Sequence, residues 1–367
     1  MAIKKRFFLI NIFFAIIAFF YGRVVAIRNK LYDLGVFKSY QFKTHIIVIG
    51  NLSVGGTGKT PHIEYLIRLL SDEFNINVLS RGYKRQFTGY IEAEPHHTVA
   101  VLGDEPRQIF LKFPYINLVV DEKRVRAITN IEKKTIDNDK QPVILMDDAF
   151  QHRSVLGGLN ILLIDINNLP ENDYYLPLGT LRDNKKQIKR ANIIIFTKVE
   201  EDLKPIEKRI LKNNLNLSAY QKVYFTKIIY KALIPLFSRK EVFDIKQLDV
   251  NFSVLLITGI ERPETIYNFL NNKNIQIIHM RYNDHHIYSQ TDISDIIFNF
   301  GQIMAAKKLI ITTEKDAVRL KDSNFAEQIQ HLPIYYLPIE IDFLSKEEKD
   351  KFNEQILKYV RENRSIS

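Results

Sequence analysis

Short apolar runs alternate with amphipathic stretches along most of the chain, and this alternation predicts its secondary structure. The stretch after residue 60 is of the helical type, because its apolar residues recur at the spacing of one helix face. Strands that alternate with such helices are typical of a doubly wound, mostly parallel α/β sheet. The predicted strands of this sheet lie at 45–50, 77–80, 98–102, 116–120, 143–146, 160–164 and 192–196.

A second and shorter series of apolar runs follows toward the C-terminus. Between its second and third members, an amphipathic helix carries apolar residues at helical spacing from Ile293 through Ile303 to Met304. The stretch 200–250 is rich in lysine and has no strong period, so we place a domain boundary there. The strands of this second series are predicted at 253–258, 275–279, 309–313 and 334–340.

These patterns predict an α/β protein with two domains and two flanking segments. We expect a first domain at 31–220 and a second, smaller α/β domain at 221–340. Residues 1–30 form an N-terminal hydrophobic helix. The C-terminal segment 341–367 contains a polar helix at 344–361 whose placement the sequence does not predict.

The N-terminal segment is the most hydrophobic part of the chain. Residues 7–21 contain no charge, and basic residues flank both ends. As a helix this stretch is roughly 22 Å long, shorter than the ~30 Å hydrocarbon core of a bilayer. No small-residue cleavage site of the signal-peptide type follows it. We therefore favour a membrane anchor that inserts without necessarily crossing, and a buried core helix is the alternative.

The charge of the chain is concentrated beside this segment. The net charge is +10, and residues 1–44 hold eight basic residues against the single acid Asp33, so this region carries +7 of the +10. Basic residues beside an apolar helix favour anionic lipid headgroups over nucleic acid, for which the sequence has no recognised motif. The chain has no cysteine, which excludes disulfides, thiolate catalysis and cysteine-ligated zinc.

Residues 46–61 join an apolar strand to a glycine-rich loop, which predicts a nucleotide-binding site. Backbone N–H groups of such a loop bind phosphates at a helix N-terminus. Lys59 would reach the β- and γ-phosphates, and the Thr60 hydroxyl would ligate Mg²⁺. The standard spacing has glycine at position 53, where Ser53 stands. The predicted ATP- or GTP-binding residues are Ser53, Val54, Gly55, Gly56, Thr57, Gly58, Lys59 and Thr60.

Several acidic residues stand where predicted strands end. Asp147 and Asp148 follow the buried strand 143–146, the position of an acid that holds Mg²⁺ together with the loop hydroxyl. Asp104 follows the predicted strand 98–102, so it would lie at the edge where open α/β sheets bind ligands. By itself it is equally typical of a helix cap and of a catalytic acid.

The second domain offers one further candidate for chemistry. Asp284, His285 and His286 follow a predicted strand, and they form either a solvated loop or a general-base pair. Arg81 and Arg182 stand in loops from which each would reach phosphates.

Taken together, these motifs resemble one family, the tetraacyldisaccharide 4′-kinases of lipid A biosynthesis. The resemblance covers nearly the whole chain, and the family's loop also lacks a glycine at the position of Ser53. The chain departs from the family at Ala149, where glycine is usual, and at Asp183 and Asn184, where Glu-Pro is usual. The resemblance rests on Tyr21, Gly22, Arg28, Leu31, Tyr32, residues 50–61, 80–83 and 103–106, Asp147, Asp148, Gln151, His152, residues 176–182, Gly259, Ile260, Pro263, Asp284, His285 and residues 313–316.

The resemblance implies a lipid kinase. Such an enzyme transfers the γ-phosphate of ATP, with Mg²⁺, to the 4′-hydroxyl of an acylated glucosamine disaccharide 1-phosphate. It works at the cytoplasmic face of the bacterial inner membrane, so its partners would be this lipid and the anionic inner leaflet. The resemblance also implies two α/β domains joined by a hinge, with no obligate protein partner.

The residue roles follow from the same resemblance. Lys59 would stabilise the transferring phosphate, and Asp147 and Asp148 would organise the metal and the nucleotide. Asp104 would be the general base for the sugar hydroxyl, oriented and tuned by His285 across the cleft. A carboxylate in this role suits phosphoryl transfer, which depends chiefly on positioning and charge neutralisation.

Two other functions compete with this reading. A membrane-associated P-loop ATPase switch is the first alternative, although such switches often carry a second lysine where Val54 stands. A non-catalytic ATP-binding scaffold is the second, and the presence of Lys59, Thr60 and both carboxylates at 147 and 148 disfavours it.

Overall fold

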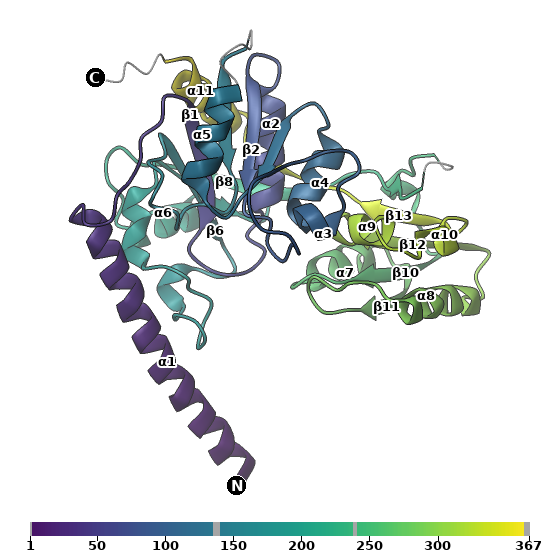
Figure 1. Cartoon of the computed structure of the whole chain (residues 1–367). Coiled ribbons are helices and arrows are strands. Elements are labelled where there is room, and N and C mark those ends of the chain that lie inside the picture. Colours follow the sequence, from purple (N-terminus) through teal and green to yellow (C-terminus); the bar gives the residue numbers. More distant parts are fainter. Residues whose placement is uncertain (1, 135–139, 238–240, 363–367) are drawn as a thin grey trace.

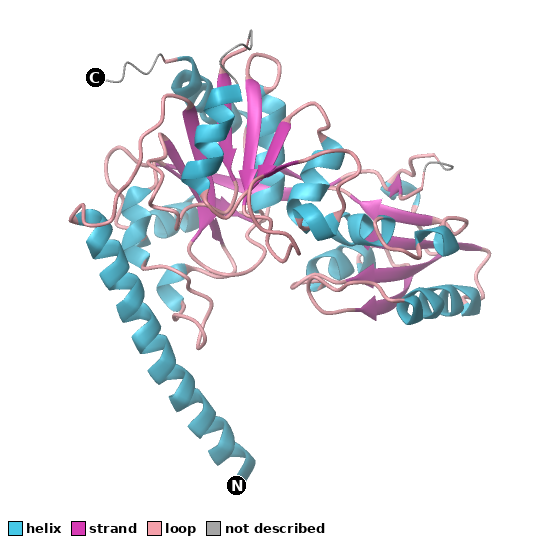
Figure 2. Cartoon of the chain, viewed as in Figure 1, coloured by secondary structure: helices cyan, strands magenta, loops and turns pink. Residues whose placement is uncertain are grey.

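The computed structural model describes residues 2–134, 140–237 and 241–362. Two α/β domains lie side by side, and the long helix α1 projects away from the larger one (Figure 1). Each domain is built on a single central sheet with helices packed against it (Figure 2).

The larger domain contains a nine-stranded sheet in the order β14-β8-β7-β6-β1-β5-β2-β4-β3. The neighbours from β8 to β4 are all parallel, whereas β14 and β3 add antiparallel edges. This confirms the predicted doubly wound, mostly parallel sheet. Its strands are β1 (His45–Asn51), β2 (Asn75–Ser80), β3 (Ile91–Glu92), β4 (Asn117–Val120), β5 (Pro142–Met146), β6 (Leu159–Asp165), β7 (Ile193–Thr197), β8 (Lys222–Tyr230) and β14 (Ile339–Phe343).

Helices cover both faces of this sheet because alternate strand residues point to opposite sides. One face packs its core against α2, α4 and α11, and the other packs against α5 and α6. The helices are α2 (Lys59–Leu70), α3 (Val99–Leu102), α4 (Asp104–Lys112), α5 (Arg124–Lys134), α6 (Pro205–Asn214) and α11 (Lys346–Arg361), with 3-10 turns at Pro170–Asn172 and Lys185–Arg190.

The smaller domain contains a five-stranded sheet in the order β11-β10-β12-β13-β9, which is parallel except for β9. It confirms the predicted second α/β domain. The strands are β9 (Ile234–Pro235), β10 (Phe252–Thr258), β11 (Gln276–Arg281), β12 (Lys307–Thr313) and β13 (Ile334–Leu337). The helices are α7 (Glu264–Asn271), α8 (Gln290–Gln302), α9 (Glu314–Lys321) and α10 (Ala326–Ile329), with a 3-10 turn at Ile245–Gln247.

Three predicted elements differ from the structure. The apolar run 98–102 is the short helix α3, not a strand, and a run this short has no periodicity that separates the two. The predicted strand 334–340 divides at Pro338 into β13 and β14, which belong to different sheets. Met304 lies beyond the end of α8 and is 99% exposed, so it is not part of the apolar helix face.

The domain boundaries differ from the predicted positions 220 and 340. Strand β8 pairs with β7, and β14 pairs with β8, so both belong to the large sheet. The smaller domain therefore lies between residues 231 and 338. Helix α11 packs on the large domain through Phe352, Ile356 and Val360, which supplies the placement that the sequence left open. Strand pairing between distant segments decides these boundaries, and the local composition of the chain does not predict this pairing.

Helix α1 extends over Ala2–Asp33, well beyond the apolar stretch that ends at Tyr21. Its segment Asn11–Asp33 is long and apolar enough to cross a membrane, and only 17% of it is buried. The C-terminal half is attached to the large domain. There, the Tyr21 hydroxyl donates to the Arg182 carbonyl (3.1 Å) and Asn29 Nδ2 donates to Asp183 Oδ1 (2.7 Å).

Candidate active site

The phosphate loop connects β1 to α2 and presents backbone N–H groups at the start of that helix. Gly55 (φ 111°) and Gly58 (φ 87°) adopt left-handed conformations that favour glycine. Two hydrogen bonds stabilise the loop. Asn51 Nδ2 donates to Thr57 Oγ1 (2.9 Å), and the Val54 backbone N–H donates to the Thr180 carbonyl (2.7 Å). The geometry suits an anion at the N-terminus of α2.

Lys59, Asp148 and Arg182 form a charged cluster beside this loop. Lys59 Nζ lies 3.7 Å from Asp148 Oδ1. The Arg182 guanidinium donates to both carboxylate oxygens of Asp148, at 2.9 and 2.7 Å. Burial alone would raise the pKa of Asp148, but the charges of Lys59 and Arg182 hold it well below its usual range. Asp148 is therefore an ionised carboxylate between two cations.

Asp147 has a different environment from its neighbour. It is only 2% exposed, and its Oδ2 accepts a hydrogen bond from the Ser80 hydroxyl (3.0 Å). Its Oδ1 is buried and has no hydrogen-bond partner in the described part of the chain. Burial, together with the charges of Glu105 and Asp148, raises the pKa of Asp147 to about 7. A buried carboxylate oxygen without a donor is suited to a hard divalent cation such as Mg²⁺.

Asp104 and His285 come from different domains and meet at the interface. Asp104 is the first residue of α4, and His285 lies in the loop after β11. His285 Nδ1 lies 2.6 Å from Asp104 Oδ2, and Arg319 Nε donates to the same oxygen (2.8 Å). Burial would raise the pKa of Asp104, but the hydrogen bonds from His285 and Arg319 lower it to about 2. The pair is an ionised carboxylate hydrogen-bonded to imidazole.

The element that precedes Asp104 differs from the one that the sequence predicts. Asp104 follows α3 and Gly103 (φ 91°) and not the end of a strand. The N-terminus of α4 favours its negative charge. His285 adopts φ 63°, and its backbone N–H donates to the Gly259 carbonyl (3.2 Å), which fixes the base of its side chain.

Arg319 is a site residue that sequence reasoning missed. It lies on α9, is 6% exposed, and also donates to Asp316 Oδ1 (2.9 Å) and the Gly259 carbonyl (2.8 Å). The sequence offers one indication of its role, since Arg319 stands three residues after Asp316, at the spacing of an ion pair on one helix face. The charged residues of this helix otherwise have the pattern of a solvent-exposed surface. On the same helix, Lys315 forms an ion pair with Glu105 across the domain interface.

Residues 55–60 of the loop, Asp148 and His285 line one cleft between the domains, whereas Asp104 and Asp147 are not part of its lining. It holds about 1600 Å³ of space, part of it open to solvent. One wall is the phosphate loop with Asp148 and Arg182, and the facing wall includes His285 from the smaller domain. Toward β8 the lining becomes apolar, with Ile228 and Tyr230.

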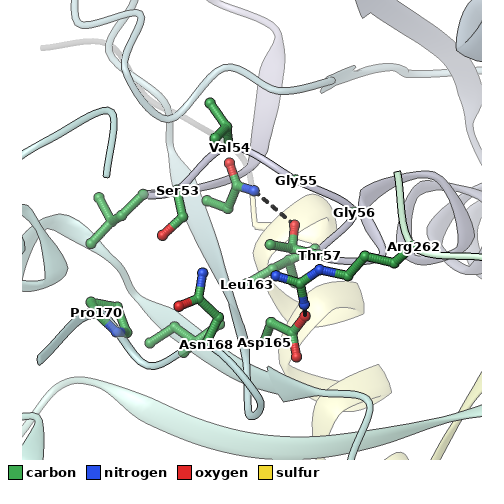
Figure 3. A pocket seen from close by; sticks show the side chains of 13 residues that line it. Ser53, Val54, Gly55, Gly56, Thr57, Leu163, Asp165, Asn168, Pro170 and Arg262 are labelled. Carbon is green, nitrogen blue, oxygen red and sulfur yellow. Dashed lines mark hydrogen bonds and ion pairs between the residues drawn. The ribbon is translucent and has the colours of Figure 1, made fainter. Parts of the chain in front are cut away.

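A narrower pocket flanks the phosphate loop on the side of β6. Figure 3 shows Ser53 and Val54 on its rim and Asp165 at the end of β6. Arg262 reaches into it from the smaller domain, and its guanidinium lies 3.1 Å from Asp165 Oδ2. The smaller domain thus also contacts the end of β6, which borders the same pocket as the phosphate loop. Arg81, in contrast, is exposed.

Comparisons with known proteins agree with this architecture. A family model described as "Tetraacyldisaccharide-1-P 4'-kinase" matches residues 10–361. The chain is 45% identical to a tetraacyldisaccharide 4′-kinase of Bacteroides thetaiotaomicron, covering 95% of this chain and 92% of the relative. It is 40% identical to one from Flavobacterium johnsoniae, covering 94% and 96%.

A solved structure extends the likeness to three dimensions. The crystal structure of LpxK from Aquifex aeolicus in complex with ATP matches with a TM-score of 0.69 and 25% identity, covering 94% of this chain and 97% of that one. The sequence resemblance is thereby confirmed over nearly the whole chain. The chain belongs to the tetraacyldisaccharide-1-P 4′-kinase family.

Proposed function

We propose that this protein transfers the γ-phosphate of ATP to the 4′-hydroxyl of tetraacyldisaccharide 1-phosphate and yields the 1,4′-bisphosphate. The observation that carries the proposal is the Asp104–His285 contact of 2.6 Å, which borders the same cleft as the phosphate loop. The names of the relatives support the choice of acceptor.

The described residues suit each part of the transfer. The N–H groups of the phosphate loop and Lys59 hold the phosphates and neutralise charge that develops on them. The acceptor oxygen forms its bond to the γ-phosphorus as the bond to the bridging oxygen of ADP breaks. The Asp104–His285 pair receives the hydroxyl proton. Because the pair spans both domains, it is complete only when they approach each other, which would limit transfer to water.

Three oxygen ligands fit the Mg²⁺ that this chemistry uses. Asp147 contributes a buried, unpartnered oxygen, and Asp148 and Thr60 both line the cleft. Mg²⁺ bound by these residues would supply charge neutralisation for the phosphates.

Helix α1 supports a location at the cytoplasmic face of the bacterial inner membrane. Its apolar side chains Phe13, Phe20, Val24 and Ile27 are each at least 60% exposed. Burial of this surface in the inner leaflet would bring the cleft to the headgroups, where an acylated substrate remains with its chains in the bilayer. The basic residues near the helix favour anionic lipid. We propose neither a nucleic-acid partner nor an obligate protein partner for this chain.

The test uses purified full-length protein, radiolabelled ATP, Mg²⁺ and tetraacyldisaccharide 1-phosphate in detergent micelles. We expect a labelled bisphosphorylated lipid that is absent with Lys59→Ala. Lipid-stimulated release of free phosphate without labelled lipid would instead indicate the membrane-associated ATPase switch.

A further inference from the structure

Glu261 of the smaller domain contacts the phosphate loop of the larger one. It lies between β10 and α7, and its Oε2 accepts a hydrogen bond from the Gly56 backbone N–H (3.2 Å). A Cβ atom built on Gly55 would lie 3.1 Å from Oε2 and 3.3 Å from Oε1. Both carboxylate oxygens therefore lie close to the α-carbon of Gly55, and one of them accepts from the Gly56 N–H.

A carboxylate at this position resembles a phosphate in the contacts it makes. Loops of this kind bind nucleotides through their backbone N–H groups, and an anion with two acceptor oxygens satisfies the same donors. The Gly56 N–H has one hydrogen, and two anions at one point repel each other. A nucleotide phosphate that uses this N–H must therefore displace Glu261.

The neighbouring residue holds Glu261 in place over the loop. The Arg262 guanidinium pairs with Asp165 Oδ2 (3.1 Å), and the same oxygen accepts from Lys198 Nζ (2.8 Å). Figure 3 shows Arg262 crossing above the pocket to Asp165, beside Gly55 and Gly56. Asp165 is 4% exposed, so this attachment is to a buried group at the end of β6.

The loop that carries Glu261 also contacts the candidate catalytic pair. Two residues before Glu261, the Gly259 carbonyl accepts from the His285 backbone N–H (3.2 Å) and from Arg319 (2.8 Å). The Gly259 N–H donates to Asp316 Oδ2 (2.9 Å). A four-residue segment thus joins the phosphate loop to the two groups that hold Asp104.

We propose that Glu261 is a built-in competitor of nucleotide phosphate, and that its displacement is transmitted through Gly259 to His285 and Arg319. The proposal rests on the proposed use of this loop for ATP. Under this proposal, nucleotide binding at the phosphate loop is coupled to the geometry of the Asp104–His285 pair, and a change in either one alters the other.

The first experiment measures binding of a fluorescent ADP analogue to the full-length protein without lipid. We expect Glu261→Gln to bind about three- to tenfold more tightly than wild type, the effect of removing one competing hydrogen-bonded charge. The matched control is Glu264→Gln, because Glu264 pairs with Arg281 within the smaller domain (2.9 Å), and its affinity should equal that of wild type.

The outcomes separate this proposal from the proposed function. Equal affinity of wild type and Glu261→Gln would overturn the competition alone. Weaker binding by Glu261→Gln would also overturn it, since Glu261 would then assist the nucleotide. A wild-type protein that binds no nucleotide would overturn both proposals.

A second measurement tests the transmission. The imidazole NMR signals of His285, assigned by their loss in His285→Gln, should move when ADP saturates the wild type. In Glu261→Gln without ADP they should already lie toward the ADP-saturated position. Signals that coincide with those of wild type without ADP would overturn the link through Gly259.

Discussion

His285 Nδ1 lies 2.6 Å from Asp104 Oδ2, although 181 residues separate them in sequence and they belong to different domains. Arg319, which is also from the smaller domain, donates to the same oxygen. Two side chains of one domain thus hold a carboxylate of the other. The relative position of the domains therefore determines whether this carboxylate has its partners.

Replacement of Asp104 by Asn should remove proton acceptance while the nucleotide site stays intact. We expect the turnover number to fall by about 10²–10⁴, the usual contribution of a positioned general base. Affinity for ADP should change by much less than turnover, because the phosphate loop binds through its own backbone and Lys59 and is coupled to Asp104 through the segment at Gly259. Turnover is measured with labelled ATP and lipid, and a rate near that of wild type would exclude Asp104 as the base.

Arg319 should act on the pH dependence of the reaction through Asp104. The hydrogen bond and charge of Arg319 lower the pKa of Asp104, so Arg319→Lys should raise it. Because Asp104 must be ionised to accept a proton, the acid limb of the rate profile should move to higher pH. Lysine retains the charge but lacks the second N–H that Arg319 directs at this oxygen. A lower rate with an unmoved acid limb would indicate a purely structural role.

Asp147→Asn should stabilise the protein while it lowers activity. The folded-state pKa of Asp147 is raised to about 7 from 3.8, so its ionised form is disfavoured in the folded protein. The resulting loss of stability begins as pH rises above 3.8 and reaches its full size above about 7. With EDTA present, the melting temperature of the variant should exceed that of wild type by more at pH 8 than at pH 5.

The matched control for this prediction is Asp202→Asn, because Asp202 is exposed. Its melting temperature should follow that of wild type at both pH values. An Asp147→Asn protein whose advantage does not grow with pH would contradict the assignment of a costly buried charge.

Removal of residues 2–20 should separate membrane retention from nucleotide binding. The truncated chain keeps Tyr21 and Asn29, which attach α1 to the large domain. It loses the exposed apolar side chains of the projecting helix, including Phe13 and Phe20. We expect weaker sedimentation with anionic vesicles and lower turnover of the lipid, with unchanged affinity for ADP. Full retention on vesicles would show that another surface binds the membrane.

Local sequence was sufficient for features that one continuous segment with a distinctive motif makes. Residues 45–70 contain β1, the phosphate loop and α2 in one continuous run, so the loop was predictable from its spacing alone. The position of Asp147 and Asp148 directly after a buried strand was predictable in the same way. Local sequence failed at 98–102, where a run this short does not separate helix from strand.

The amino-acid sequence by itself determined the α/β class, the apolar helix and the phosphate loop, because periodicity and glycine placement are properties of neighbouring residues. Only the tertiary structure decided that β8 and β14 join the large sheet, and that Arg319 and Glu261 reach across the interface. These relationships depend on strand pairing and domain packing between distant segments. The sequence does not distinguish a buried arginine from one exposed to solvent. The physical reason is that burial and partnership arise only when the chain is folded.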